Sequence, residues 1–385
     1  MKLLVIGCGQ CGGRLADEFA YMNKRAKAQG GFEVLTNTIA VNTDVADLSG
    51  LQNIRSDYQH RILIGTKRTG GHGVGKLNEI VADLARADGD KVIEAVRQTP
   101  RLAETDAFLL IAGAAGGTGS GSISVLTQLI KERFMDKPVY NMIVLPFRYE
   151  EATEERSIFN VGTCLKSAYM AADAVFLVDN QRYLKKDASL QQNLARINRM
   201  VVKPFFNVLC AGEETNPKYI GSKVLDGGDI IQTLSGWTVI GYGSSRTNND
   251  KMHFLNRNNE TQRGVQAMDQ ALADLSVKAD PNEARKALYL LTGNAKDMNM
   301  DLINDLSSTL KSMATEAVIR SGDYPRGTNG VLEVTVILSE LTNSRKVIDY
   351  FSRTIEYINR AKHIQMAAMD QYGMTESFGD IPSFL

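Results

Sequence analysis

Short apolar runs alternate with amphipathic stretches through the first half of the chain. Between the runs, apolar side chains recur at helical spacing, as Leu15, Phe19 and Met22 do. Strands that alternate with helices predict a mainly parallel α/β sheet covered on both faces, with ligands bound at the carboxyl ends of its strands. The runs that read as buried strands are Leu3–Ile6, Ile39–Asn42, Ile62–Ile64, Ala107–Ala112, Tyr140–Leu145 and Ala174–Val178.

The second half of the chain has a different pattern. It opens with a long helical stretch over Ser189–Val202, which Pro204 is expected to stop or kink. Helices and strands then mix, which predicts a second, α+β domain. The expected division is a first domain over 1–188, a central core helix over 189–209, a second domain over 210–372 and a short tail over 373–385. The elements expected after the core helix are helices around Thr261–Leu275, Ala295–Ala314 and Ser344–Tyr372, and strands at Trp237–Gly241, Leu288–Leu291 and Leu332–Leu338.

Composition narrows the class of protein. Lys plus Arg number 44 and so do Asp plus Glu, which argues against nucleic acid or an anionic membrane as the main partner. The longest apolar stretches, Phe108–Ala115 and Met142–Phe147, are too short to span a bilayer, and the first residues do not read as a signal peptide. Four cysteines do not make a disulfide framework. We therefore expect a cytoplasmic protein that does not insert into membranes.

The first glycine-rich loop, Gly7–Gly13, comes between a predicted strand and a predicted helix. It fits G-x-G-x-x-G at Gly7, Gly9 and Gly12, where glycines let the backbone approach a phosphate at a helix N-terminus. A dinucleotide site also needs an acidic residue about 20 residues further on. Here the second strand ends later, at Asp44. An NAD-dependent oxidoreductase therefore remains an alternative.

The second loop, Gly70–Lys76, contains G-x-x-x-x-G-K, the core of a P-loop. The next residue is Leu77, where Mg²⁺ coordination in a P-loop needs Ser or Thr. We therefore favour a loop that covers a terminal phosphate, and a flexible glycine-rich turn is the alternative.

The third loop, Gly113–Ser122, again joins a buried strand to an amphipathic helix. Its small residues expose consecutive backbone N–H groups, which form an anion-binding nest. The hydroxyl groups of Thr118, Ser120 and Ser122 add further donors. A flexible linker would not be expected between two such elements, so this loop predicts a phosphate site.

These loops together resemble the tubulin/FtsZ superfamily. Ala115–Gly121 is similar to the tubulin signature GGGTGSG, and Gly9–Gly12 to the GQCG of tubulins. Asn42–Asp44 looks like the NTD of FtsZ, and Pro146–Glu150 followed by Arg156 looks like its PFxFE…R segment with a longer spacing. The mixture of features is most like the archaeal CetZ group.

The resemblance implies a cytoskeletal GTPase that polymerises head to tail, binds GTP or GDP with Mg²⁺ near Gln10, and acts in cell shape or division, with filaments near the cell envelope. Guanine would be read by Asn180 and Asn193, and Ser189 stands where the family usually stacks an aromatic ring on the base. The nucleotide-contacting residues implied are Gly9, Gln10, Cys11, Gly12, Arg14, Asn42, Asp44, Gly71, Gly73, Gly113, Ala115, Gly116, Gly117, Thr118, Gly119, Ser120, Glu150, Arg156, Asn180 and Asn193.

The resemblance also implies where hydrolysis occurs. In this family a carboxylate loop of the next subunit completes the site, and in FtsZ it reads NxDxxD. Here Val224 replaces the Asn, and Asp226 and Asp229 supply both carboxylates. We expect them to be catalytic across a head-to-tail interface. A plain turn is the other interpretation of Asp-Gly-Gly-Asp.

Two further motifs stand outside this scheme. Cys8 and Cys11 form C-x-x-C, but no second Cys or His cluster supports a redox or metal role. The tail Asp380–Leu385 resembles the DIPxFL peptide that ends many FtsZ chains, which predicts a docking site for an adaptor protein. Packing of this tail on the chain's own body is the alternative.

Overall fold

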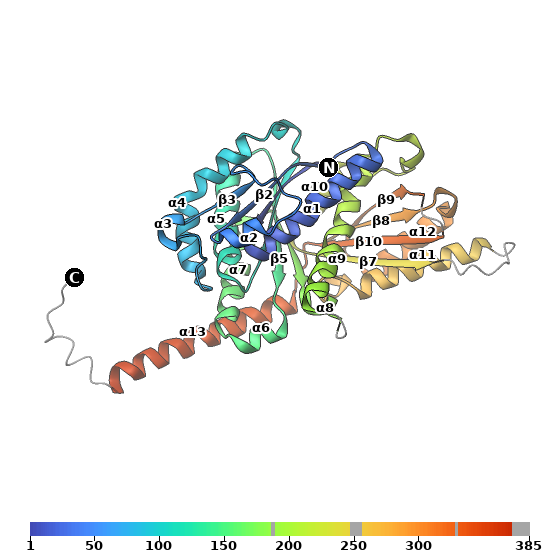
Figure 1. Cartoon of the computed structure of the whole chain (residues 1–385). Coiled ribbons are helices and arrows are strands. Elements are labelled where there is room, and N and C mark those ends of the chain that lie inside the picture. Colours follow the sequence, from blue (N-terminus) through green and yellow to red (C-terminus); the bar gives the residue numbers. More distant parts are fainter. Residues whose placement is uncertain (186–188, 247–255, 328–329, 372–385) are drawn as a thin grey trace.

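The computed structural model describes residues 1–185, 189–246, 256–327 and 330–371. Within them, one ten-stranded sheet runs through both halves of the chain in the order β3-β2-β1-β4-β5-β6-β7-β10-β8-β9 (Figure 1). The strands are β1 Leu3–Cys8, β2 Leu35–Asn42, β3 Arg61–Leu63, β4 Ala107–Gly113, β5 Val139–Leu145, β6 Ala174–Asp179, β7 Gly236–Arg246, β8 Lys286–Gly293, β9 Val318–Pro325 and β10 Val331–Ser339.

Helices cover both faces of this sheet. Among the described residues, no helix has both the length and the hydropathy to cross a membrane. The α-helices are α1 Gly9–Gly30, α2 Val45–Ser49, α3 Thr66–Thr69, α4 Asn78–Arg97, α5 Gly117–Arg133, α6 Arg148–Thr153, α7 Arg156–Ala171, α8 Asn180–Tyr183, α9 Leu190–Ala211, α10 Gly227–Thr233, α11 Asn256–Ala273, α12 Met300–Met313 and α13 Arg345–Gln371.

The parallel α/β arrangement predicted for the first half is confirmed. Strands β3 to β6 pair in parallel, and each predicted apolar run lies within or at the edge of a strand. Every residue of β1 and β5 is buried, as expected for strands packed on both faces. One core lies under α4, α5 and α7, and a second lies under α1 and α9.

The sheet continues into the second half through β7, which pairs in parallel with β6. Strand β10 runs antiparallel to both β7 and β8, and β9 closes the edge in parallel with β8. The sequence pattern did not reveal β9. Its central residues are Arg320, Ser321, Gly322 and Asp323, and these polar and small residues give no apolar run.

Of the two effects expected of Pro204 on the central helix α9, a stop or a kink, the stop is wrong. Pro204 does not stop it, since the helix runs on to Ala211. Proline lacks the N–H group that would bond to the carbonyl four residues earlier. The helix continues because the following turns are held by the core: Phe205 and Leu209 are fully buried, and Phe205 packs on Phe176 with ring centroids 4.9 Å apart.

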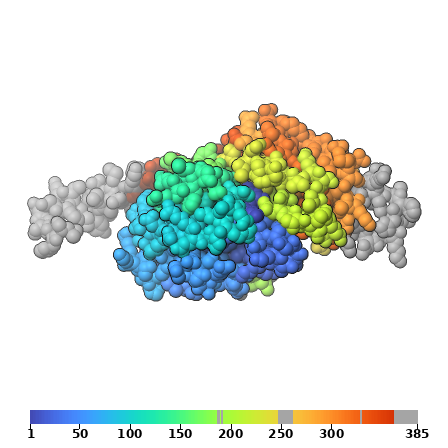
Figure 2. Space-filling model, turned by 90° about the horizontal axis from the view of Figure 1, so that it is seen from above, coloured from blue at the N-terminus to red at the C-terminus, as the bar shows by residue number. Residues whose placement is uncertain are grey.

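The space-filling view shows how the halves are joined. In Figure 2 the segment coloured yellow-green lies between the blue and teal amino-terminal half and the orange carboxyl-terminal half. The amino-terminal residue is part of this junction. The side chain of Met1 is fully buried, and its ammonium group pairs with Glu213, just after α9, at 2.8 Å.

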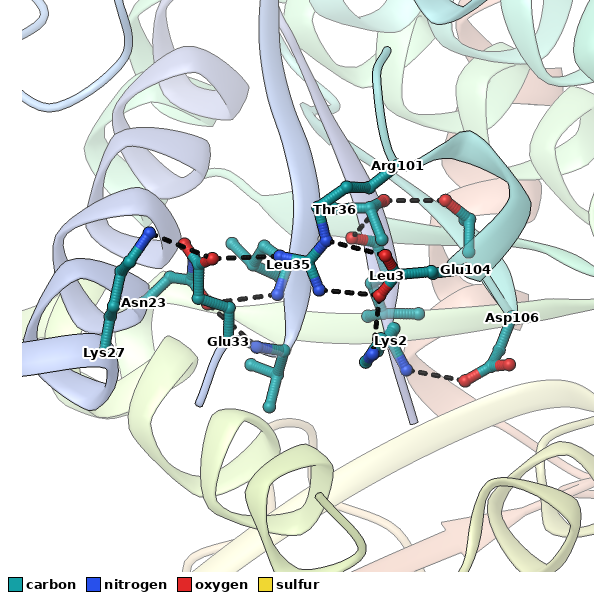
Figure 3. Close-up of polar contacts among 12 residues, drawn as sticks. Lys2, Leu3, Asn23, Lys27, Glu33, Leu35, Thr36, Arg101, Glu104 and Asp106 are labelled. Carbon is teal, nitrogen blue, oxygen red and sulfur yellow. Dashed lines mark hydrogen bonds and ion pairs between the residues drawn. The ribbon is translucent and has the colours of Figure 1, made fainter. Parts of the chain in front are cut away.

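The amino ends of the strands carry a charged network (Figure 3). Glu104 accepts from both Arg101 and Lys2, and Arg101 also pairs with Glu33 at 2.9 Å. These residues precede or begin β1, β2 and β4. Polar loops at the opposite, carboxyl ends of the same strands form the cavity described next.

Candidate nucleotide-binding site

A cavity of about 500 Å³ opens at the carboxyl ends of β1, β4 and β5. This is the edge of a parallel sheet at which ligands bind. Backbone of the first and third glycine loops forms one part of its wall, and side chains of α6 and α9 form another. The lining residues are Cys8, Gly9, Gln10, Cys11, Arg14, Leu15, Asp47, Lys76, Gly113, Ala114, Ala115, Gly116, Gly117, Thr118, Gly119, Val144, Leu145, Pro146, Phe147, Tyr149, Glu150, Asn180, Leu194, Ile197, Asn198 and Val201.

The first loop must be glycine-rich for packing reasons. Gly9 starts α1 at a φ of 71°, and a Cβ there would lie 2.8 Å from the backbone nitrogen of Gly119. Gly12 does not line the cavity. A Cβ on it would lie 2.0 Å from the carbonyl oxygen of Ile111, so this glycine lets α1 approach β4. The first and third loops therefore pack directly against each other in the cavity wall.

The third loop presents a helix N-terminus to the cavity, because α5 begins at Gly117. Of the three hydroxyl groups predicted to face a phosphate, only that of Thr118 belongs to a residue of the cavity wall. Thr118 lines the cavity and its Oγ1 lies 2.7 Å from Oγ1 of Thr43. Ser120 and Ser122 instead donate to the carbonyl groups of Gly116 and Thr118, one helical turn earlier. Their hydroxyl groups therefore serve the helix rather than the cavity.

The second loop packs over the segment after β2. The carbonyl of Gly71 accepts from the backbone of Val45, and the N–H group of Gly73 donates to Thr43 at 3.2 Å. Neither glycine lines the cavity. From this loop it is Lys76 that does so, and its ammonium group pairs with Glu154 at 2.5 Å.

A single side chain ties the second and third loops together. The amide of Asn160, on α7, donates to the carbonyl groups of both Lys76 and Ala115 at 3.0 Å. Asn160 is fully buried, so these bonds are shielded from water. The second and third loops are therefore bridged by this one buried amide.

A polar chain lies beside the first loop. Asp47 lines the cavity and accepts from Gln10 at 2.6 Å and from Asn42 at 3.1 Å. Asn42 and Asp44 lie behind this residue rather than in the cavity wall, and Asp44 caps α2 by accepting from the N–H group of Ala46. Sequence reasoning missed Asp47. The sequence did contain a sign of it, because Asp47 is an acidic residue one helical turn after Asp44, the N-cap of α2.

The predicted base and ribose contacts divide into two groups. Glu150 and Asn180 line the cavity, and Oε2 of Glu150 accepts from the backbone of Phe147 at 2.8 Å. Arg156 lies elsewhere and donates to Glu79 on α4. Asn193 is buried and exchanges hydrogen bonds with the backbone of Lys185 instead of lining the cavity.

Where the predicted contacts do not line the cavity, other residues do. On α9 they are Leu194, Ile197, Asn198 and Val201, which lie on the helix face that α9 turns to the cavity. Ser189 caps this helix, because its hydroxyl oxygen accepts from the backbone N–H group of Gln192 at 3.2 Å. As a serine it offers no aromatic ring that could stack on a base. Tyr149, half exposed, is an aromatic residue of the wall that the sequence did not single out.

The C-x-x-C pair is poorly suited to redox chemistry. Burial raises the pKa of both Cys8 and Cys11 to about 12, which keeps each thiol protonated and weakly nucleophilic at neutral pH. No group of three or more His, Cys, Asp or Glu residues that could hold a metal occurs in the described part of the chain. Cys11 is a wall residue of the cavity.

Asp226 and Asp229 lie at the other end of the sheet. A Cβ on Gly227, between them, would lie 3.7 Å from Asp106 and from Met1, which stand at the amino ends of β4 and β1. Oδ1 of Asp226 accepts from the backbone of Asp229 at 2.8 Å and so caps α10. The two carboxylates and the cavity are therefore separated by the length of β1, roughly 20 Å for six residues.

Comparison with known proteins agrees with this geometry. Residues 2–186 match the model of the Tubulin/FtsZ family GTPase domain, and residues 187–356 match the Tubulin-like CetZ C-terminal domain. The chain is 31% identical to Tubulin-like protein CetZ1 of Haloferax volcanii over 95% of this chain and 94% of that protein. It is 26% identical to Tubulin-like protein CetZ of Pyrococcus abyssi, over 93% and 90% respectively.

Solved structures are similar to this one over nearly their full length. A GDP-bound monomer of CetZ1 from Haloferax volcanii gives a TM-score of 0.80 at 29% identity, covering 93% of this chain and 99% of that one. A GTPγS-bound protofilament of CetZ2 from Haloferax volcanii gives 0.81 at 28% identity, covering 94% and 100%. The oxidoreductase interpretation of the first loop is thereby set aside, and the chain belongs to the tubulin/FtsZ family of GTPases, in its CetZ group.

Proposed function

We propose that this GTPase polymerises head to tail and hydrolyses GTP where two copies meet. One observation carries this proposal: the cavity opens at the carboxyl ends of the strands, whereas Asp226 and Asp229 lie beside their amino ends. The two parts cannot meet within one chain. They meet if copies stack in the same direction, and a heterologous contact of that kind repeats to give a filament.

The loops supply the phosphate-binding part of the proposed site. The N-terminus of α5 and the backbone around Gly9 present N–H groups and positive dipole ends, which suit a polyphosphate. Glu150 and Asn180 line the same cavity, and the resemblance to the family assigns them to ribose and guanine. The tie that Asn160 makes would hold the loops around the terminal phosphate.

The side-chain oxygen atoms at the cavity are ligands that suit a magnesium ion. Asp47 and Gln10 offer oxygen ligands beside the phosphate loops, and Mg²⁺ bound to a nucleotide needs only one or two carboxylates from the protein. When bound, the ion would neutralise charge on the phosphates. The carboxylates of Asp226 and Asp229 from the next copy would polarise the attacking water and accept its proton, a contribution of roughly 10²–10⁴ in rate.

The test is phosphate release from GTP over a range of protein concentrations. A specific activity that rises steeply above a threshold supports a site completed between copies. A rate per chain that does not change with concentration contradicts it. The competing function, a nucleotide-binding scaffold that does not polymerise, predicts no increase in light scattering when GTP is added.

We also propose that the filaments serve cell shape or division and lie near the cell envelope, as the resemblance to the family implies. The residues predicted to dock an adaptor, Asp380–Leu385, lie outside the described residues. When residues 379–385 are deleted, we expect one protein that crosslinks to the full chain in cells to be no longer crosslinked. An unchanged set of partners would refute the docking proposal, and an unaltered cell outline after gene deletion would refute the role in shape.

A further inference from the structure

Arg320 of β9 holds the carboxylate that is expected to act on GTP. Its Nε donates to Oδ1 of Asp229 at 3.1 Å, and its Nη2 donates to Oε1 of Gln232, one turn further along α10. Both side chains of the ion pair reach the surface, with exposed fractions of 23% for Arg320 and 38% for Asp229. The guanidinium group therefore lies on the face that the next copy's cavity would cover.

If hydrolysis occurs at that face, negative charges of the two chains are brought close together. Asp226 and Asp229 would both approach a polyphosphate, and like charges repel strongly once an interface excludes water. A cation on the same face would offset this repulsion in addition to a magnesium ion. Lys2 and Arg101, at the amino ends of the strands, pair with Glu33 and Glu104 and not with Asp226 or Asp229.

Lys223, three residues before Asp226, and Arg320, on β9, are cations of the second domain. Lys223 donates from Nζ to the hydroxyl of Ser321 at 2.6 Å, and no ion pair of Lys223 with Asp226 or Asp229 occurs in the described structure. Arg320 pairs with Asp229 itself. A phosphate oxygen that comes within reach of Asp229 therefore also comes within reach of the Arg320 guanidinium.

We propose that Arg320 acts in trans as a second catalytic group, contacting the terminal phosphate of the GTP held by the neighbouring copy. The inference rests on the proposed function, because it requires the head-to-tail site. A planar guanidinium can serve both partners, with Nε on Asp229 and its outer nitrogens turned from Gln232 to phosphate oxygens. It would position the carboxylate toward water and offset charge on the phosphate in the transition state. Arginines supplied in trans do the latter in other phosphoryl-transfer enzymes.

The test compares Arg320→Ala with Lys223→Ala in the full chain. For Arg320→Ala we expect phosphate release per polymerised chain to fall at least about 100-fold. The affinity of the unassembled chain for GTP should not change, because the cavity lies at the other end of the sheet. Arg320→Lys should recover part of the rate, and Lys223→Ala should keep the wild-type rate. Equal losses in Arg320→Ala and Lys223→Ala would overturn the inference, because net charge alone would then explain them.

Asp229→Asn separates this inference from the proposed function. If wild-type release does not depend on concentration, the proposed function fails and the inference with it. If Asp229→Asn stops hydrolysis in polymers and Arg320→Ala does not, only the role of Arg320 is refuted. If Arg320→Ala does not assemble alone, it is copolymerised with excess wild type. Turnover that falls with the incorporated fraction supports the inference, and unchanged turnover or exclusion from the polymer overturns it.

Discussion

At the scale of single residues, the cavity depends on glycines, which have no side chain, as much as on the side chains that line it. The glycine loops are usually explained by close approach to phosphate. In this chain Gly9 and Gly12 are required first by the protein itself, since a Cβ at either would collide with backbone of Gly119 or Ile111. Gly116 differs, because nothing lies within 4 Å of its Cβ position.

Gly9→Ala is therefore expected to destabilise the chain by about 2 kcal/mol, since it places a Cβ on a left-handed backbone and in a clash with Gly119. Gly116→Ala is the matched control in the third loop. It should leave the free energy of unfolding within about 0.5 kcal/mol of wild type. Denaturant unfolding measures both, and equal stability of the two variants would refute the packing argument.

Asp229→Asn should lower phosphate release in polymers by about 10²-fold or more, because the amide cannot take a proton from water. The change keeps the size of the side chain, so GTP binding and assembly should persist. Asp226→Asn is a useful partner variant because Asn also caps helices well, which preserves the start of α10. Normal hydrolysis in both variants would show that these residues form a plain turn.

At the scale of elements, the second and third loops are joined through a side chain of α7. Asn160→Asp keeps the shape of the side chain but removes the N–H donor that bridges Lys76 and Ala115. Each buried carbonyl left unpaired costs about 1–3 kcal/mol. We expect a lower melting temperature and weaker GTP binding, the latter measured by equilibrium titration. Wild-type affinity with only a lower melting temperature would mean that the tie serves stability alone.

The charged network at the amino ends of the strands gives a pH dependence. Arg101 and Lys2 lower the pKa of Glu104 from 4.5 to about 2. A carboxyl with a lowered folded-state pKa stabilises the fold above its unfolded pKa, and this contribution disappears as pH falls from about 4.5 to about 2. Glu104→Gln should therefore lose less stability than wild type between about pH 5 and about pH 3, by denaturant unfolding. Parallel losses would contradict this assignment.

At the scale of the whole molecule, the direction of the sheet is the main determinant of the proposed function. The cavity and the two carboxylates lie at opposite ends of the same parallel strands. A prediction follows for mixtures. Asp229→Asn keeps an intact cavity, and a variant with a damaged cavity, such as Asp47→Ala, keeps intact carboxylates. Each should release little phosphate alone, and their mixture should recover part of the rate, because the cavity of the first meets the carboxylates of the second. No recovery in copolymers of the two would contradict a shared site.

The sequence by itself determined the α/β class, the three loops, and the carboxylate pair. Buried parallel strands require apolar runs, and phosphate loops require glycine, so both leave a local pattern. It also indicated the family, through motifs that recur in a fixed order. Strand β9 left no such pattern, since Arg320, Ser321 and Asp323 do not form an apolar run.

Only the tertiary structure decided which of these residues meet. It placed Asp47, Lys76 and Tyr149 in the cavity wall and Arg156 and Asn193 outside it, because helix faces and loop packing set the direction of each side chain. It let α9 pass Pro204, because core packing outweighs one lost hydrogen bond. It also paired Arg320 with Asp229 across 91 positions in sequence, a contact that only the pairing of distant strands and helices can create.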